Sequence, residues 1–497
     1  MSDALLFAAG VIYLAVVGLL FAYGINFLYL TVLALRRPGD PLAPSLTDYP
    51  SVTVQLPIYN ELYVAERLIR AAAALDYPRE RFEIQVLDDS TDETTAIVQR
   101  LVTGLRAGGL NIQHICREKR QGFKAGALAA GLETASGEFL AVFDADFVPH
   151  ADFLQKTVAF FQDPQVGFVQ ARWEHLNREY SLLTRLQALA IDAHFIVEQT
   201  ARSAGGYWFN FNGTAGVWRK SAILSAGGWR ADTLTEDLDL SYRSFLKGWK
   251  AIYLRDVSVP GELPASFNAY RRQQQRWARG SLECALLLIP QVWRAPIGLA
   301  GKLQSTLHLT GYFVHLLLFT LTLLYLPVSI LAERYPHLVS LFGLAVIFNV
   351  TALAPTTMFM AAQKTKGRGW LSQLPAVLFL TVLGCGMMVN TTRAAYEVLN
   401  HRPGSFERTP KYGIAHRGQH WTDRSKYHLR VDTVVYLELV LAAWSAGTTW
   451  LALHTGAWGI AFYAALFCAG LLFVSGMSVL QTLTVRRHTL EPAHLGD

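Results

Sequence analysis

One run of apolar residues constrains this chain more than any other feature. It extends from Leu5 to Leu35, contains no charged side chain, and exceeds the roughly 20 residues that a helix needs to cross a bilayer. A cleaved signal peptide is the alternative, but Asp3 stands where a basic start is expected, and the run is too long for a signal core. Arg36 and Arg37 follow directly and predict that this end faces the cytoplasm.

Apolar runs return in the last third of the chain. They lie near Leu307–Leu331, Leu338–Ala362, Leu374–Val389, Val434–Leu453 and Ala457–Leu480. Eight basic residues against three acidic ones lie between Thr392 and Val431, and three more basic residues follow Ala362. Both flanks of Leu374–Val389 therefore read as cytoplasmic, and we expect this 16-residue run to be re-entrant or interfacial. Five spans remain, with the N-terminus outside and the C-terminus inside.

Composition agrees with a chain that lies partly in lipid. Only 16% of the residues are charged, whereas soluble domains carry about 25%. The net charge is 44 − 38 = +6, which is compatible with nucleic acid, an anionic membrane surface or phosphorylated ligands. The basic residues cluster beside the apolar runs, so we expect membrane lipid and no nucleic acid as a partner. The four cysteines have no metal-knuckle or redox-pair spacing and are expected to be free thiols.

Between about Ser51 and Ala300 short apolar runs alternate with helical patterns. Such alternation predicts a mostly parallel sheet with helices on both faces, whose ligand site lies at the carboxyl ends of the strands. The predicted strands are 52–56, 82–87, 111–115 and 139–143, and the predicted helices are 61–75, 92–105, 124–133 and 151–161.

Polar motifs follow two of these strands. Asp88 and Asp89 end one strand, where they either cap the next helix or accept hydrogen bonds from a nucleotide base or ribose. Asp144 and Asp146 end another, and residues two apart on an extended chain point the same way. Two such carboxylates suit Mg²⁺ or Mn²⁺, which would neutralise a diphosphate leaving group.

Two further motifs lie downstream. Asp237, in Thr235-Glu236-Asp237, either caps a helix or acts as a general base whose charged form the helix N-terminus favours. An amphipathic surface helix explains the many arginines around Gln273-Gln274-Gln275-Arg276-Trp277, but not the Gln-x-x-Arg-Trp order. Arg can hold phosphate through two parallel hydrogen bonds, and Trp offers a flat face to a sugar ring.

Taken together, in this order, the motifs resemble those of the processive family 2 glycosyltransferases, which include cellulose, chitin and hyaluronan synthases. The resemblance extends to Pro57-Ile58-Tyr59-Asn60-Glu61, Arg117-Glu118 and Gly122-Phe123-Lys124-Ala125-Gly126. Phe406-Glu407-Arg408-Thr409-Pro410-Lys411 looks like the Phe-x-x-Thr-x-Lys gating loop of cellulose synthases. Residues 55–61 and 85–92 look most like the cellulose-synthase-like A and C mannan and glucan synthases.

The resemblance implies a role for each matching position. Tyr59, Glu61, Asp88, Asp89 and Lys124 would bind the nucleotide sugar, together with Asp144, Asp146, Gln273, Arg276 and Trp277. Asp146 would be the preferred direct metal ligand, and Asp237 the catalytic base. Asn212, Gly213, Thr214, Glu236 and Trp277 would bind the acceptor, although the family more often shows a Cys-Gly-Ser-like turn where Asn212 begins this one. Phe406, Thr409 and Lys411 would belong to the gating loop.

The resemblance implies that the α/β domain between the membrane helices is GT-A-like. The expected divisions are a helix at 1–37, a cytoplasmic transferase domain with interfacial helices at 38–300, and a membrane region at 301–497 with a gating loop at 392–431. We expect an inverting hexosyltransferase of the plasma or inner membrane, which uses UDP-glucose or GDP-mannose to extend a glucan, mannan or glucomannan, with β-1,4 linkage. A single-addition lipid glycosyltransferase, similar to ceramide glucosyltransferase, is the alternative enzyme, and a transporter or scaffold with a degenerate domain is the alternative of another class.

Overall fold

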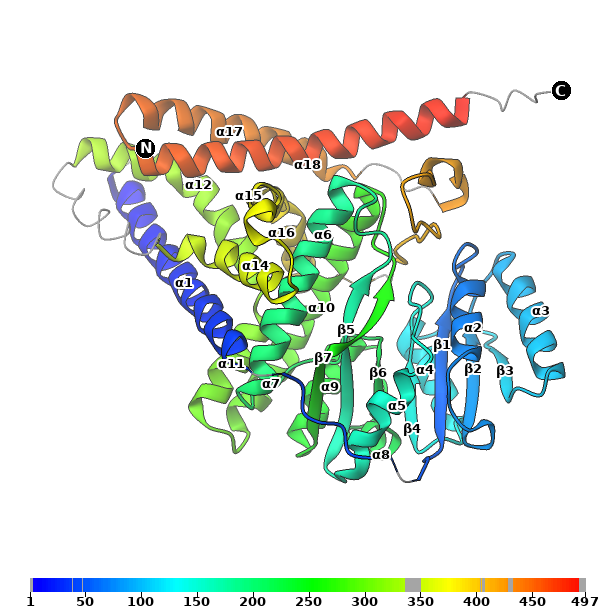
Figure 1. Ribbon diagram of the computed structural model, residues 1–497. Helices are drawn as coiled ribbons and strands as arrows, with labels where there is room; N and C mark the ends of the chain where they lie inside the picture. Colours follow the sequence, from blue (N-terminus) through cyan, green and yellow to red (C-terminus); the bar gives the residue numbers. More distant parts are fainter. Residues whose placement is uncertain are drawn as a thin grey trace.

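A twisted sheet and its helices occupy one side of the molecule, and the long apolar helices occupy the other (Figure 1). This computed structural model describes residues 3–37, 39–46, 48–335, 350–402, 404, 407–427 and 432–490. Helix α1 (Asp3–Arg36) runs along the outer side of the helical part and leads into the first strand through an extended segment.

The sheet has seven strands in the order β3-β2-β1-β4-β6-β5-β7. The strands are β1 (Val52–Ile58), β2 (Phe82–Asp88), β3 (Ile112–Cys116), β4 (Phe139–Val142), β5 (Val166–His175), β6 (Gly216–Arg219) and β7 (Lys250–Gly261). Strands β1 to β4 pair in parallel, β6 pairs antiparallel with β4 and β5, and β5 pairs in parallel with β7. The prediction of a mostly parallel sheet is confirmed.

Both faces of the sheet are covered by helices, because alternate side chains along the buried strands point to opposite faces. Val52, Val54 and Leu56 pack with one set of helices, while Thr53 and Gln55 face the other side and are also buried. The first set is α2 (Ala65–Ala73), α3 (Thr94–Ala107) and α5 (Phe153–Val158). The second set is α4 (Phe123–Thr134), α8 (Lys220–Ser225) and α9 (Glu236–Leu246).

The remaining helices form the other half of the molecule. They are α6 (Leu182–Ala193), α7 (Thr200–Ala204), α10 (Phe267–Arg294), α11 (Leu299–Leu309), α12 (Phe313–Arg334), α14 (Ala354–Thr365), α15 (Trp370–Gly386), α16 (Met388–Leu399), α17 (Val434–His454) and α18 (Trp458–Leu490). A π-helical turn, His194–Gln199, joins α6 to α7. Short 3₁₀ turns lie at Arg79–Arg81, Ala159–Gln162, Val350–Leu353, Trp421–Asp423 and Ser425–Tyr427.

Five helical stretches among the described residues are long and apolar enough to cross a membrane: Asp3–Arg36, Phe313–Arg334, Trp370–Leu399, Val434–His454 and Trp458–Thr484. The count matches the prediction, but one member differs. Leu374–Val389 was expected to be too short to span, whereas the helical stretch continues through polar residues to Leu399 and is 30 residues long. Most of the first half of Leu338–Ala362 lies outside the described residues, and its end forms part of α14.

A buried ion pair and two hydrogen bonds connect α10 to α17 and α18. Arg271 of α10 donates to the Glu438 carboxylate of α17 at 2.6 Å and to the Ser478 hydroxyl of α18 at 2.8 Å. Both charged side chains are almost completely buried. The backbone N–H of Phe267, also on α10, donates to Gln481 of α18 at 2.6 Å. Helix α10 is therefore held against the α17–α18 hairpin by polar contacts as well as by apolar packing.

This arrangement predicts an asymmetric response to mutation. Arg271→Met leaves the buried Glu438 carboxylate without its partner and should destabilise the protein by about 3–5 kcal/mol, whereas Arg271→Met with Glu438→Leu should restore most of the loss. The measurement is the thermal unfolding midpoint in detergent. Arg70→Met, which breaks an exposed ion pair with Glu66, is the control and should leave the midpoint unchanged. A double variant less stable than Arg271→Met would contradict this account.

Candidate active site

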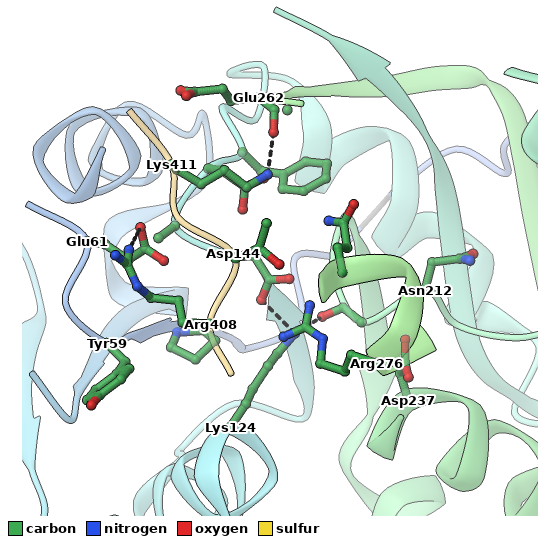
Figure 2. A pocket seen from close by; sticks show the side chains of 18 of the residues that line it. Tyr59, Glu61, Lys124, Asp144, Asn212, Asp237, Glu262, Arg276, Arg408 and Lys411 are labelled. Carbon is green, nitrogen blue, oxygen red and sulfur yellow. Dashed lines mark hydrogen bonds and ion pairs between the residues drawn. The ribbon is translucent and has the colours of Figure 1, made fainter. Parts of the chain in front are cut away.

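A cavity opens at the carboxyl ends of β1 and β4, bounded by α9, α10 and the segment around Arg408–Lys411 (Figure 2). Most of the predicted site residues line it: Tyr59, Glu61, Asp89, Lys124, Asp144, Asp146, Asn212, Gly213, Glu236, Asp237, Gln273, Arg276, Trp277, Thr409 and Lys411. Asp88 and Thr214 do not line it, and Phe406 lies outside the described residues. Residues from distant parts of the sequence thus meet in one place.

The turn after β4 presents its first carboxylate to a lysine. The backbone N–H of Asp144 donates to the buried Thr214 hydroxyl at 2.9 Å, so Thr214 supports this turn from behind the cavity wall. Lys124 of α4 lies 2.6 Å from Asp144 Oδ1 and 3.6 Å from Glu236 Oε1. The same ammonium donates to the Gly213 carbonyl oxygen at 2.9 Å. Lys124 therefore connects three segments of the cavity wall.

The second carboxylate of the turn meets a lysine from the far end of the chain. Lys411 Nζ lies 2.6 Å from Asp146 Oδ2 and also donates to the Glu262 carbonyl oxygen. The Glu262 carboxylate accepts from the backbone N–H of Tyr412 at 2.9 Å and from Arg67 at 3.0 Å. These contacts hold the segment that carries Lys411 across the mouth of the cavity (Figure 2).

The same segment carries Arg408, which reaches toward the other side of the cavity. Arg408 lies 2.8 Å from Glu61 Oε2 and stacks on the Tyr427 ring at 4.0 Å. Burial raises the pKa of Glu61 to about 8, and the Arg408 guanidinium opposes that rise. Arg120 lies 3.4 Å from the centre of the Tyr59 ring. Neither arginine was among the predicted site residues, although Arg408 lies inside the Phe-x-x-Thr-x-Lys motif.

The donor set formed by Asp144 and Asp146 fits a hard divalent cation. Each carboxylate has one oxygen paired with a lysine, Asp144 Oδ1 with Lys124 and Asp146 Oδ2 with Lys411, and its second oxygen could bind a metal. Mg²⁺ typically binds one or two protein carboxylates together with substrate phosphates, so two protein ligands suffice here. Burial raises the pKa of Asp144, against the opposing charge of Lys124.

Asp237 stands in the first turn of α9, beside the glycine of the Asn212-Gly213 turn. Its Oδ1 accepts the backbone N–H of Leu238 at 2.9 Å. Burial and the neighbouring Glu236 carboxylate raise the pKa of Asp237 to about 7, although Lys124 opposes the shift. The helix N-terminus was expected to favour the charged form, but desolvation outweighs that effect here. A carboxyl group that titrates near neutrality can accept a proton at working pH.

Helix α10 supplies a cation and an aromatic face. Gln273, Arg276 and Trp277 are spaced i, i+3 and i+4, so they share one side of the helix. Burial lowers the pKa of Arg276, and the carboxylates of Glu236 and Asp144 oppose that shift. Trp277 lies near Trp173, with ring centres 6.4 Å apart.

The two acids at the end of β2 do not act as a pair. Asp89 forms a two-point ion pair with Arg117 and lines the cavity. Asp88 is 2% exposed, accepts from the backbone N–H of Ser90 at 2.9 Å, and lies 2.9 Å from His114 Nε2. Consecutive residues at a strand end point to opposite sides, so only one of the two can face the cavity. Of the two acids predicted to bind a nucleoside, Asp89 lines the cavity and Asp88 does not, and the role of both stays a prediction.

The end of β5 forms a wall that the sequence patterns did not indicate. Trp173, Glu174 and His175 line the cavity. Lys366 contacts Glu174 at 2.9 Å and the buried Asp192 at 2.8 Å. Burial would raise the pKa of Glu174, but Lys366 and Arg172 lower it to about 2. This wall is therefore fixed by the connection between α14 and α15.

A second cavity adjoins the first and shares Trp173, Asn212, Asp237 and Trp277 with it. It continues between α1, α10, α12 and the π-helical turn. Polar and aromatic side chains line it, including Asn26, His194, Glu198, Tyr270, Gln274, Tyr312 and His315. Single π-helical turns occur often at functional sites.

Comparison with known proteins identifies the domain around this cavity. Residues 50–280 match the family described as "Glycosyltransferase like family 2". A probable glucomannan 4-beta-mannosyltransferase of Oryza sativa is 50% identical over 238 residues, which is 47% of this chain and 41% of that protein. A glucomannan 4-beta-mannosyltransferase of Arabidopsis thaliana is 46% identical over 246 residues, 48% of this chain and 46% of that protein. The alignments thus span less than half the length of these relatives.

A solved structure shares the fold. The mannosyltransferase PcManGT of Pyrobaculum calidifontis, determined in complex with GDP-Man and Mn²⁺, aligns with a TM-score of 0.51 at 22% identity. The alignment covers 80% of this chain and 100% of that one. Similarity at this level shows that the two chains share an architecture.

The tight approach of Gly213 to the charged cluster gives a prediction. A Cβ at Gly213, whose φ is +78°, would lie 3.0 Å from Asp237 Oδ2 and 3.2 Å from Lys124 Nζ. Gly213→Ala should therefore lower turnover of a nucleotide-sugar donor by at least about tenfold, since small displacements of reacting groups are costly. Gly228→Ala is the matched control, because Gly228 has a φ of +74° and no atom within 4 Å of such a Cβ. Equal activity losses in both variants would attribute the effect to backbone strain alone.

Proposed function

We propose, from the premise that residues 50–280 belong to the family 2 glycosyltransferases, that this chain is a membrane-bound enzyme that extends a β-1,4-linked mannan or glucomannan. The observation that carries the proposal is the single cavity in which Asp144, Asp146 and Asp237 meet Lys124 and Arg276. That set can bind a diphosphate through cations and still provide a carboxylate for an incoming hydroxyl. A scaffold without catalytic activity would not require all of these carboxylates and cations in one cavity.

GDP-mannose is the proposed principal donor, with UDP-glucose as a second donor if the product is a glucomannan. The names of the plant relatives and the GDP-Man complex of the archaeal enzyme support this choice. Tyr59, Glu61 and Asp89 would contact the nucleoside, with Arg408 and Arg120 completing that side of the cavity. Asp88 would act by holding the strand end rather than by direct contact.

Asp144 and Asp146 would hold Mg²⁺ or Mn²⁺, which supplies charge neutralisation for the diphosphate. Lys124 and Arg276 would bind the departing diphosphate, assisted by Gln273. Asp237 would take the proton from the acceptor hydroxyl as that oxygen attacks the anomeric carbon. One displacement inverts the anomeric centre, so an α-linked donor yields a β-linked product. No covalent intermediate is required, because the leaving group is already stabilised.

The acceptor would approach from the second cavity. Trp277 offers its ring to a sugar, and Asn212, Gly213 and Glu236 lie beside Asp237, with Thr214 supporting them from behind. The second cavity leads from these residues to α1 and α12, both long enough to span a membrane, and a growing chain would leave along that path. In this scheme residues 38–300 form the catalytic unit on the cytoplasmic side, 1–37 and 301–497 form the membrane region, and Thr409 and Lys411 close over bound donor.

The function is tested by the product. Purified full-length chain, incubated with labelled GDP-mannose and Mg²⁺ or Mn²⁺, should give a ladder or smear that a β-1,4-mannanase degrades. A strong chelator should abolish incorporation, and either ion should restore it, because the diphosphate would then again be neutralised. A lipid-soluble single product would instead assign a glycolipid transferase, and an α-linked product or full activity without metal would refute the mechanism.

The base assignment predicts both a mutant phenotype and a pH profile. Asp237→Asn should lower kcat by at least about a hundredfold with little change in donor affinity. Because burial and Glu236 raise the pKa of Asp237 to about 7, the wild-type rate should rise with pH through neutrality as the base loses its proton, then level off. Asp232→Asn, which changes an exposed carboxylate outside the cavity, is the control. A variant that kept its turnover but lost donor affinity would exclude Asp237 as the base.

A further inference from the structure

Three donor side chains converge on one face of the sheet, away from the catalytic cavity. Strands β2 and β3 run in parallel at the side of the sheet farthest from the long helices (Figure 1). Asp88 pairs with Cys116, and His114 lies two residues before Cys116 on the same strand. Paired residues, and residues two apart on a strand, project from the same face. The backbone register therefore brings a carboxylate, an imidazole and a thiol together.

The donor atoms are close enough to share one ion. His114 Nε2 lies 2.9 Å from Asp88 Oδ2 and 3.2 Å from Cys116 Sγ, and all three donor atoms lie within 4.8 Å of one another. Asp88 is buried and Cys116 is exposed, so the cluster opens to solvent on one side. None of the three lines the cavity that contains Asp144 and Asp146.

The hydrogen bonds around His114 orient its free nitrogen toward this point. His114 Nδ1 lies 2.7 Å from Gln99 Oε1, an oxygen that can accept from an Nδ1–H. In the neutral tautomer with this hydrogen, Nε2 presents a lone pair to the Asp88 carboxylate, so that two acceptors face each other across 2.9 Å. A cation between them, either a proton or a metal ion, removes that repulsion. Metal-binding histidines commonly donate their second N–H in this way.

The mixture of donors selects the metal. Mg²⁺ and Ca²⁺ prefer oxygen ligands, whereas a thiolate with an imidazole and a carboxylate suits Zn²⁺. Tetrahedral zinc with bonds of about 2.0–2.3 Å places its ligands roughly 3.3–3.8 Å apart, so the 2.9 Å and 3.2 Å distances from His114 Nε2 would have to widen slightly. Cys116 is at an exposed strand end and can provide it. The fourth position would hold water.

We propose that Asp88, His114 and Cys116 form a Zn²⁺ site, and that zinc bound there lowers donor turnover. The effect of zinc on turnover rests on the proposed function. We infer this effect because Asp88 is followed directly by Asp89, which lines the catalytic cavity and is held by Arg117. Movement of Asp88 toward a metal would be transmitted to Asp89 through one peptide bond.

Binding is tested without reference to activity, on the full-length protein in detergent with Co²⁺ as a spectroscopic probe for the zinc position. Wild type should show a cobalt–thiolate charge-transfer band that added Zn²⁺ removes. Cys116→Ser should lack the band, whereas Cys468→Ser, which removes another free thiol, should keep it. No band in wild type, or an equal band in Cys116→Ser, would overturn the site.

The inhibitory consequence has its own readout. With saturating Mg²⁺, micromolar Zn²⁺ should lower transfer by wild type, and Cys116→Ser should need at least about tenfold more Zn²⁺ for the same loss. Without zinc the two proteins should have equal rates. Equal zinc sensitivity in both would overturn the link to turnover. If no donor is turned over by any variant, the proposed function fails, while the cobalt experiment still decides the site.

Discussion

The active site depends on cations that balance the negative charge of several carboxylates, which the fold brings together at one end of the sheet. A single cavity is lined by Asp144, Asp146, Glu236 and Asp237, and the negative charges of neighbouring carboxylates make each one harder to ionise. Lys124 and Lys411 each pair with one acid of the turn after β4, and Arg276 lies within range of the whole group. These cations come from α4, from the segment after α16 and from α10. The site is therefore complete only when all three are packed against the sheet.

This requirement gives a role to the ion pairs that the long helices make with the segments around the cavity. Helix α10, which carries Arg276, is fixed by the buried pair between Arg271 and Glu438 of α17. The wall at Glu174 is fixed by Lys366, and Arg368 lies 2.8 Å from Asp192 behind it. A rearrangement among the long helices would reach the charged cavity through these contacts. The charge balance in the cavity therefore depends on how the long helices pack.

The features that depend on local sequence periodicity, such as the strands, were predicted correctly from the sequence. Strands β1 to β4 follow from short apolar runs, and the runs of β2 and β4 are followed by acids. Asp237 was predicted from Thr235-Glu236-Asp237, and it lines the same cavity as Asp144. The sequence did not predict that the adjacent acids at the end of β2 make different contacts, Asp89 with Arg117 in the cavity wall and Asp88 with His114. It also missed what only tertiary packing decides, such as the pairing of Arg408 with Glu61 across most of the chain length. The short run 374–389 was expected not to span, and the structure includes it in a longer helical stretch, Trp370–Leu399, that is long enough to do so.

The lysine pairs also bear on how such a site can be ready before donor arrives. A cavity with four uncompensated carboxylates would repel a diphosphate, whereas here each acid of the turn after β4 already has a cation within 2.6 Å. In the proposed reaction Asp144 and Asp146 would hold a metal ion, and Lys124 and Lys411 would then pair with phosphate oxygens. The same ammonium groups would neutralise the carboxylates before the donor binds and would stabilise the departing diphosphate during the reaction.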